Sequence, residues 1–356
     1  MAMSARLSPW MILGWRIRLP AFDSVWSSPV RAIHYLVLAL ALAGCAGNMF
    51  SLKPAIPANV MHEGVHSGGS ALAFNPAGTL LASGGWEGRV YLWSLPGGKR
   101  QAVWQAHDGS VNGLAFIEDG GVLISAGYDR RIVLWDLRGD GRASVRTESP
   151  VTSLAVAAGR GLLASGHDDG RVIVWRLQDK RRLERVGQKR LHTRRVRGLA
   201  WHPGKPALAS SGRDGRVMQW TIGGGVVEFP PPSTYSRSLV YTPNGRTLIG
   251  SGWFRLFRWD LEARRLHEIP TEHNGIINSI ALGSEGRHLA SISRQTDSAV
   301  YFLDPSTGEV IERFQPHELC GGFVALSGDG RYLATTSDDA SVRIWDLERP
   351  RGKRTR

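Results

Sequence analysis

Seven copies of one pattern, each about 40 residues long, constrain the fold of this chain more than any other feature of its sequence. Each copy contains an apolar segment, a turn, a second segment with Ser or Thr, an acidic turn and a third segment. The third segments end on Trp93, Trp135, Trp175, Trp220, Trp259, Leu303 and Trp345. Short strands repeated at roughly 40–45 residues are typical of propeller blades. We therefore predict an all-β fold, a seven-bladed β-propeller of four-stranded antiparallel blades.

The second copy shows the pattern most clearly. Alternating apolar residues at 111–116 are followed by a Gly-containing turn, a strand at 122–125, an acidic turn and a strand at 131–136. Such runs, bounded by Gly and Asp, predict antiparallel strands joined by tight turns. The last copy ends on its third strand, so residues 57–62 are predicted to supply the fourth strand and close the ring, which also removes an exposed sheet edge.

Several copies also share a set of polar residues. In the second, fourth and seventh copies a His lies 22 residues before an acid, and a hydroxyl residue lies four before that acid. Together with the closing Trp-Asp pair, this set resembles the WD-repeat β-propeller family over residues 57–348, in a bacterial lipoprotein form. The resemblance implies a buried structural tetrad in each regular copy. The expected members are His107, Ser125, Asp129 and Trp135; Ser165, Asp169 and Trp175; His192, Ser210, Asp214 and Trp220; and His317, Thr335, Asp339 and Trp345.

The remaining copies depart from the set. The first has Glu87 as its acid with His66 one residue nearer, and the third has no His before Val151. The fifth has a shortened turn at 252–254 without a carboxylate, and the sixth has Leu303 in place of Trp. The sixth keeps three members: His273, Ser291 and Asp297. We expect the fifth and sixth blades to be the loosest in the ring.

Two motifs suggest enzymes but are better explained by structure. A Ser-His-Asp set forms the triad of hydrolases, yet a nucleophile occurs once, whereas this set recurs with Trp as a fourth member. Residues 62–66 match H-E-x-x-H, which binds zinc on a helix. The Gly at 64 and the Ser-Gly-Gly-Ser that follows are incompatible with that helix. We therefore predict no catalytic residue, no metal site and no cofactor.

Residues 31–45 are typical of a lipoprotein signal. A basic residue, an apolar run too short to span a bilayer comfortably and several small residues precede Cys45. The Leu-Ala-Gly-Cys at 42–45 resembles the lipobox of bacterial lipoproteins. The resemblance implies that Cys45 is lipidated and anchors the protein to the bacterial outer membrane, facing the periplasm. Inner-membrane anchoring and an uncleaved anchor segment are the alternatives.

The predicted domain organisation follows from these segments. It comprises an upstream extension at 1–29 that is not native, a signal peptide at 30–44, a lipidated N-terminus and linker at 45–56, the propeller at 57–348 and a basic tail at 349–356. Only one other cysteine exists, Cys320, so lipidation of Cys45 leaves no disulfide. Cys320 is predicted to begin a strand and to be buried.

The chain is basic, with a formal charge of +13, and 38 of its 44 basic residues are Arg. Clusters at 180–197 and 349–356 are predicted to lie on an outer strand with its following loop and in the tail. Basic outer strands protect against edge pairing, and the alternative is attraction to an anionic surface such as lipid headgroups. Nucleic acid is not expected as a partner, because no aromatic stacking platform is interleaved with the basic residues.

In WD-repeat propellers the residue before the tetrad acid commonly points to a partner-binding face. In this chain that position holds Trp86, Tyr128, Asp168, Arg213, Thr296 and Asp338, with Trp253 as the nearest match in the fifth copy. Aromatic residues and Arg are enriched at interaction hot spots. The alternative is that Trp86 and Trp253 only cover turns that lack a normal acid.

The preferred function is a non-enzymatic, lipid-anchored scaffold of the bacterial cell envelope that binds one or more envelope proteins. The alternatives are a propeller hydrolase or oxidoreductase with a central-pocket site, and an assembly factor for outer-membrane proteins. The fold alone does not decide between them.

Overall fold

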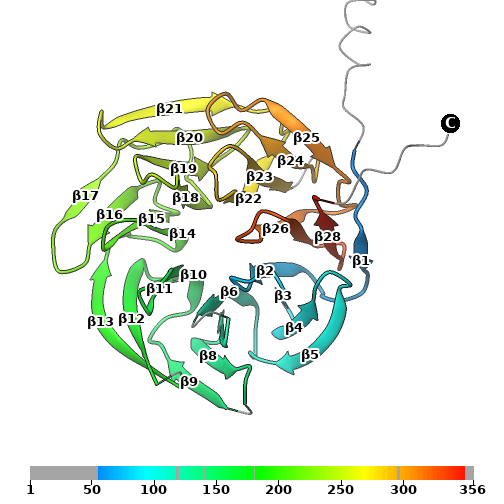
Figure 1. Cartoon of the computed structure of the whole chain (residues 1–356). Coiled ribbons are helices and arrows are strands. Elements are labelled where there is room, and N and C mark those ends of the chain that lie inside the picture. The colour runs from blue at the N-terminus through cyan, green and yellow to red at the C-terminus, as the bar shows by residue number, and fades with distance from the viewer. Residues whose placement is uncertain (1–54, 118–119, 140, 180, 295–296, 349–356) are drawn as a thin grey trace, which may run out of the picture. The chain divides into compact units, whose positions relative to one another are not determined.

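The computed structural model describes residues 55–117, 120–139, 141–179, 181–294 and 297–348. These residues form seven four-stranded antiparallel sheets around a central axis, as Figure 1 shows. The predicted seven-bladed propeller is therefore confirmed. Within the described ranges, no helix is long and apolar enough to cross a membrane. The predicted signal peptide, Cys45 and the basic tail lie outside the described residues.

Each of the first six blades consists of four consecutive strands, which follow one another from the channel outwards. Blade 1 contains β2 (Gly69–Phe74), β3 (Leu80–Gly85), β4 (Arg89–Ser94) and β5 (Lys99–Gln105); blade 2 contains β6 (Val111–Ile117), β7 (Val122–Gly127), β8 (Arg131–Asp136) and β9 (Arg142–Arg146); blade 3 contains β10 (Val151–Ala157), β11 (Leu162–His167), β12 (Arg171–Gln178) and β13 (Arg182–Arg190). Blade 4 contains β14 (Val196–Trp201), β15 (Ala207–Gly212), β16 (Val217–Thr221) and β17 (Val226–Glu228); blade 5 contains β18 (Leu239–Tyr241), β19 (Thr247–Ser251), β20 (Arg255–Asp260) and β21 (Arg265–Pro270); blade 6 contains β22 (Ile276–Leu282), β23 (Leu289–Arg294), β24 (Val300–Leu303) and β25 (Val310–Phe314).

Blade 7 joins the two ends of the described chain. It contains β26 (Gly321–Leu326), β27 (Tyr332–Ser337), β28 (Val342–Asp346) and, as its outer strand, β1 (Val60–His62). β1 pairs antiparallel with β28, with Val60 opposite Ile344. Ile56 also joins blade 6, because its N–H donates to the carbonyl of Arg313 at 2.8 Å. Closure by residues 57–62 is confirmed, although the strand itself begins at Val60.

The burial pattern explains why these segments form blades. The second strand of blade 2, β7, is buried along its whole length, whereas the outer strand β9 alternates between exposed and half-buried residues. Apolar residues of neighbouring blades pack together, so that the core lies in the seven interfaces between blades. One example joins Val217 of blade 4 to Phe257 and Trp259 of blade 5. Every blade is thus stabilised mainly by its two neighbours.

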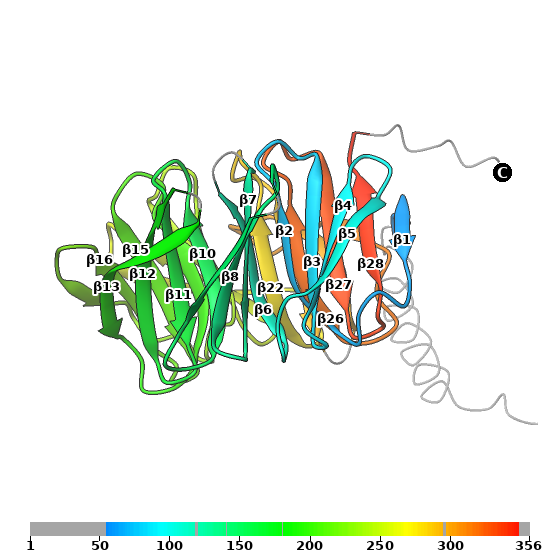
Figure 2. The ribbon, with the colours of Figure 1, turned by 90° about the horizontal axis from the view of Figure 1, so that it is seen from below.

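Strands run between two faces of the ring, with turns at both faces, as the side view in Figure 2 shows. The basic cluster at 180–197 does not lie together. The residues from Arg182 to Arg190 belong to the outer strand β13, as predicted, but Arg197 lies in the innermost strand β14. The prediction for Cys320 is wrong, because this residue precedes β26 and is only half-buried.

Candidate functional site

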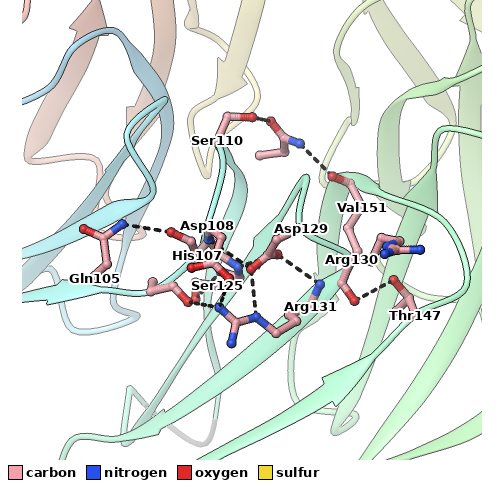
Figure 3. Close-up of polar contacts among 12 residues, drawn as sticks. Gln105, His107, Asp108, Ser110, Ser125, Asp129, Arg130, Arg131, Thr147 and Val151 are labelled. Carbon is pink, nitrogen blue, oxygen red and sulfur yellow. Dashed lines mark hydrogen bonds and ion pairs between the residues drawn. The ribbon is translucent and has the colours of Figure 1, made fainter.

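The tetrad of blade 2 is a continuous chain of hydrogen bonds, and Figure 3 shows the part formed by His107, Ser125 and Asp129. His107 Nδ1 lies 2.9 Å from Asp129 Oδ1, and His107 Nε2 lies 2.9 Å from Ser125 Oγ. Trp135 Nε1 donates to the same Ser125 Oγ at 3.1 Å. Burial lowers the pKa of His107, which favours the neutral ring. Neutral His107 then donates from Nδ1 to the carboxylate and accepts from Ser125 at Nε2.

The geometry of these hydrogen bonds favours a structural role over hydrolysis. Ser125 is 0% exposed, so no substrate carbonyl can reach its Oγ without opening the blade. That oxygen also accepts the indole N–H of Trp135, which ties the third strand to the second. Satisfied buried networks of this kind hold strands in one register. Within the described residues no group of three His, Cys, Asp or Glu could hold a metal ion.

Blades 4 and 7 contain the same His, hydroxyl and acid contacts, but the prediction for their Trp is wrong. Asp214 and Asp339 lie 3.1 and 2.9 Å from the ring nitrogens of His192 and His317, which contact Ser210 and Thr335 at 2.8 and 2.7 Å.

Among the described residues, the indole N–H of Trp220 has no hydrogen-bond partner, and its ring packs against Gly187 of β13 in blade 3. The indole of Trp345 donates instead to the carbonyl of Ile56 at 3.0 Å, because the ring-closing segment passes beside it. The Trp of blade 7 thus fastens the closure of the ring rather than the tetrad.

Blade 1 completes the tetrad with a longer acid. His66 Nδ1 lies 2.7 Å from Glu87 Oε1, and His66 Nε2 and Trp93 Nε1 both contact Ser83 Oγ. His66 lies 21 residues before its acid, one fewer than in blades 2, 4 and 7. The side chain of Glu87, one methylene longer than Asp, still reaches the ring of this His. Burial raises the pKa of Glu87, but hydrogen bonds from His66 and from the Ser67 N–H outweigh it and lower the pKa to about 2.

Blade 3 builds its tetrad from a His that the sequence analysis missed. Ser165 Oγ lies 2.9 Å from Nε2 of His167, two residues further along the same strand, and Trp175 donates to Ser165 at 2.8 Å. His167 Nδ1 donates to the carbonyl of Ser149 rather than to a carboxylate. The prediction of Asp169 as the tetrad acid is therefore wrong, since its carboxylate contacts Arg171.

A comparison with blades 1, 2 and 4 explains this replacement. The residue two after the hydroxyl is Gly85, Gly127 or Gly212 in blades 1, 2 and 4. A Cβ at any of these glycines would lie 2.4 or 2.5 Å from the imidazole ring of the tetrad His. No His precedes β10 in blade 3, so the space beside Ser165 that such a His would occupy is free. The side chain of His167, which stands where the other blades have glycine, fills that space. A His at this position was the signal that could have predicted the substitution.

Blades 5 and 6 have incomplete sets, as expected. In blade 5 the indole of Trp259 donates to the carbonyl of Pro230 at 2.9 Å, so it binds a backbone group instead of a Ser. In blade 6 His273 contacts Ser291 at 2.8 Å, but its Nδ1 is 3.6 Å from Asp297 and makes no hydrogen bond to any described residue. Their greater looseness stays a prediction.

The residues before the tetrad acids lie on one face, at the end where the innermost strands begin. In five blades the N–H of this residue donates at 2.8–3.0 Å to the carbonyl of the residue just before the innermost strand. The donors and acceptors are Trp86 and Gly68, Tyr128 and Ser110, Asp168 and Pro150, Arg213 and Arg195, and Asp338 and Cys320. Thr296 lies outside the described residues.

The short turn of blade 5 departs from this arrangement. Trp253 forms a bridge with Ile276 of blade 6, and the next residue, Phe254, donates its N–H to the carbonyl of Gly275 at 3.1 Å. Phe254, which the sequence analysis did not consider, therefore occupies a comparable place above the start of β22. We use the name entry rim for this face, defined by Trp86, Tyr128, Asp168, Arg195, Arg213, Trp253, Phe254, Arg294, Leu319 and Asp338.

Two arginines organise the side chains of the entry rim. Arg195 of blade 4 forms an ion pair with Asp168 of blade 3 and lies 5.5 Å from the ring centroid of Tyr128 in blade 2. Arg294 of blade 6 pairs with Asp338 of blade 7 at 3.0 Å and lies 5.8 Å from the Trp86 ring of blade 1. Each arginine thus connects three consecutive blades. Sequence analysis missed both roles.

The aromatic residues of the entry rim are exposed despite these contacts. Trp86, Tyr128, Trp253 and Phe254 are 45%, 44%, 39% and 46% exposed, and Leu319 is 56% exposed. Among the described residues, every large aromatic side chain with this exposure lies on the entry rim.

The two histidines of the H-E-x-x-H segment lie elsewhere in the structure. His62 contacts the carbonyl of Gly98 at 2.8 Å and stacks on Trp93, while His66 belongs to the blade 1 tetrad.

Comparison with known protein families agrees with this architecture. The model of the WD domain, G-beta repeat, matches residues 61–94, 98–136, 143–176, 184–221 and 308–346. The chain belongs to the WD-repeat family. The five matches cover the three inner strands of blades 1 to 4 and of blade 7, and the gap from 222 to 307 contains the three inner strands of blades 5 and 6, whose polar sets are incomplete. Propellers of this family are in general non-enzymatic scaffolds that bind other proteins.

Several curated proteins are similar over part of this chain. The target of rapamycin complex subunit wat1 of Schizosaccharomyces pombe is 26% identical over 164 residues, which are 44% of this chain and 52% of that protein. The poly(A)+ RNA export protein of the same organism is 24% identical over 33% of this chain and 34% of its own length. The small ribosomal subunit protein RACK1y of Oryza sativa subsp. japonica is 26% identical over 36% of this chain and 38% of its own length. The chain thus spans a third to a half of these relatives.

Proposed function

We propose that this propeller is a non-enzymatic scaffold that binds a protein partner on the entry rim. The observation that carries the proposal is the concentration of four exposed aromatic side chains on one face. Exposed apolar residues scattered over a surface are ordinary, but here all four lie on one face, in blades 1, 2 and 5, and exposed apolar area on a single face marks an interaction surface. Tyr and Trp offer a large apolar area with a polar group and lose little rotamer entropy when they bind.

The arginine contacts support the same surface. Asp168 and Asp338 hold the guanidinium groups of Arg195 and Arg294 near the aromatic rings before any partner arrives. A surface that is already ordered loses less conformational entropy on association. The ring of Trp86 also lies across Gly68, where a Cβ would be 2.7 Å from its Cδ2 atom, so the glycine fixes the place of the indole. Two relatives, the target of rapamycin complex subunit and the small ribosomal subunit protein, are named as members of larger assemblies.

The test of the entry rim is a double substitution, Trp86→Ala with Trp253→Ala. A matched control is Val103→Ala with Val227→Ala, which truncates two exposed apolar residues of the outer strands β5 and β17. Partners are captured from envelope extract and quantified by mass spectrometry. We expect the rim variant to lose the proteins that the wild type enriches and the control to keep them, with both melting like the wild type. Equal capture by both variants, or loss only after charge reversal of β13, contradicts the proposal.

We further propose that the scaffold is anchored to the bacterial cell envelope through a lipid on Cys45. Support comes from the sequence of residues 31–45, where a basic residue, an apolar run and Leu-Ala-Gly precede the cysteine. The expected location is the periplasmic side of the outer membrane. Two acyl chains give stable anchoring, since each buried CH₂ contributes about 0.8 kcal/mol. A partner of the entry rim is then an envelope protein, including a component of outer-membrane protein assembly.

Anchoring is tested by Cys45→Ala, with Cys320→Ala as the control for loss of the other cysteine. In a bacterial host, Cys45→Ala should move the protein from the membrane fraction to the soluble envelope fraction and abolish incorporation of a labelled fatty acid. The control should remain membrane-bound and labelled. Membrane retention of unlabelled Cys45→Ala protein would instead support an uncleaved anchor or adsorption through basic residues.

A further inference from the structure

The central channel contains a cavity of about 140 Å³ lined by residues from all seven innermost strands or the turns beside them. This volume is far larger than one water molecule needs. The innermost strands face the centre of the ring in Figure 1. The lining includes a group of polar side chains near the strand starts: Asn112, Thr152, Arg197, Arg237, Ser238 and Asn278.

The uncharged members of this group are used by the fold. At the starts of several innermost strands, a polar side chain donates to a backbone carbonyl of the next blade and thereby links the two. These bonds join Ser70 to Val111 at 2.6 Å, Asn112 to Val151 at 2.7 Å, Thr152 to Val196 at 2.8 Å and Asn278 to Gly322 at 2.6 Å. Arg197 is the second residue of β14, as Thr152 is of β10, but in blade 4 this place holds a charged group instead of a blade-linking one.

The two arginines are incompletely satisfied. Arg237 donates from Nη1 to Asn278 Oδ1 at 2.6 Å and from Nη2 to the hydroxyl of Tyr235 at 3.2 Å. The Nε atoms of both Arg197 and Arg237 are buried, and neither has a hydrogen-bond partner in the part of the chain that the structure describes. Among the described residues, neither guanidinium forms an ion pair with a carboxylate. Elsewhere in the fold the buried Arg343 does have one, with Asp339 at 3.3 Å.

Electrostatics show that the pair carries unbalanced charge. Burial is the main reason that the pKa of Arg197 falls to about 10, and the positive charge of Arg237 lowers it further. Burial raises the pKa of Tyr235, but the hydrogen bond from Arg237 and the charges of both arginines lower it overall. Both residues are half-buried, and partial removal of two like charges from water without a counter-ion is unfavourable for a folded protein. An anion in the channel would remove that cost.

We propose that the central channel binds a small phosphate-class oxyanion between Arg197 and Arg237. Two guanidinium groups match the charge of a phosphate dianion, and their planar N–H donors suit tetrahedral oxygens. A carboxylate would need only one of the two arginines. The occupant is inorganic phosphate or a phosphomonoester small enough for the cavity. No entry-rim residue lines this cavity, and the proposal does not depend on the function proposed for the rim.

Calorimetric titration of the full-length protein with inorganic phosphate tests the site, at constant ionic strength maintained with chloride. The variants are Arg197→Gln and Arg237→Gln, with Arg246→Gln as the matched control because Arg246 is exposed and remote from the cavity lining. We expect each channel variant to weaken phosphate binding roughly tenfold or more. The control should bind like the wild type, and Arg197→Lys should recover part of the affinity since it restores the charge.

A melting experiment identifies any variant that fails to fold. Without phosphate, Arg197→Gln should melt at or above the wild-type temperature, because it removes a half-buried charge that pairs with no carboxylate among the described residues. Phosphate should raise the melting temperature of the wild type but not of this variant. Acetate and a phosphomonoester such as glycerol phosphate distinguish the ligand classes. No phosphate binding by the wild type, equal binding by all variants, or acetate binding as tight as phosphate binding would each overturn the proposal.

Discussion

Blade 2 and blade 5 form the same four-stranded sheet from different side-chain chemistry. Blade 2 has a seven-residue innermost strand and a complete tetrad, with Ser125 bonded to both His107 and Trp135. Blade 5 has a three-residue innermost strand, no acid in its turn, and an indole bonded to a backbone carbonyl. Phe257 and Trp259 are 0% exposed in blade 5. Packing between blades therefore suffices to form a blade, and the tetrad adds rigidity and register.

The largest expected effect follows from the dependence of blade 5 on packing. Trp259→Ala should lower the free energy of unfolding by about 3–5 kcal/mol, because it leaves a cavity at the interface with blade 4. Urea unfolding followed by circular dichroism measures the change. Trp253→Ala, six residues earlier and exposed, is the control and should change stability by about 0.5 kcal/mol or less. A loss of stability no larger for Trp259→Ala than for this control would show that packing does not hold blade 5 together.

The second effect concerns the tetrad of blade 2. Asp129→Ala should cost about 1–3 kcal/mol, since it leaves the buried Nδ1–H of His107 and other donors unpaired. Asp169→Ala in blade 3 is the matched control. Its carboxylate is 30% exposed and pairs only with Arg171 and the N–H of that residue among the contacts of the described residues, so about 0.5 kcal/mol or less is expected. Equal costs in the same urea experiment would restore Asp169 as a tetrad acid and refute the role assigned to His167.

The third effect is a pH dependence of stability. Blade 1 should show it through Glu87, whereas the turn of blade 5 has no carboxylate to titrate. The pKa of Glu87 is lowered to about 2 from an ordinary value of 4.5. A carboxyl with a depressed folded-state pKa contributes stability above its unfolded-state pKa and loses it as pH falls through the folded-state value. The contribution, roughly 1–3 kcal/mol, should therefore disappear between about pH 4.5 and pH 2. Glu87→Gln keeps an acceptor for His66 but should flatten this part of the stability profile. An unchanged slope between those pH values would contradict the assignment.

The smallest effect is local. Without a polar chain, β19 of blade 5 should open more readily than β7 of blade 2, which occupies the same place in its sheet. Amide hydrogen exchange followed by mass spectrometry should show faster exchange for residues 247–251 than for residues 122–127. Blade 6 should resemble blade 5, because His273 and Asp297 are too far apart for a hydrogen bond. Uniform protection around the ring would mean that the tetrads add no rigidity.

Much of this fold could be predicted from sequence because the repeat spacing determines it. The seven third strands, the ring closure near Val60 and the tetrad of blade 2 all follow from residues that recur at fixed separations. The blade 1 acid was also visible, because Glu87 is a longer equivalent of Asp. Periodicity is informative wherever every copy meets the same packing requirement.

The remaining features depend on contacts between distant residues. Trp345 bonds to Ile56, which is 289 residues away and reaches blade 7 only because the ring closes. Arg195 and Arg294 each contact residues of two other blades, a relation that no single repeat contains. The pair of Arg197 and Arg237 in the channel was not predicted from the sequence. Arg197 belongs to a basic run that was placed on an outer strand and its following loop. His167 could have been found by asking why one copy has a His two residues after its hydroxyl and none before its innermost strand.

The central claim is that the tetrads stabilise the blades while the entry rim binds the partner, so the most direct measurement compares both functions in the same variants. Partner capture from envelope extract is performed with the Trp86→Ala, Trp253→Ala double variant and with Asp129→Ala, at a temperature where both are folded. We predict that the rim variant loses capture at a normal melting temperature, whereas Asp129→Ala melts earlier but still captures the partner. Full capture by the rim variant, or loss of capture by folded Asp129→Ala protein, would contradict the account.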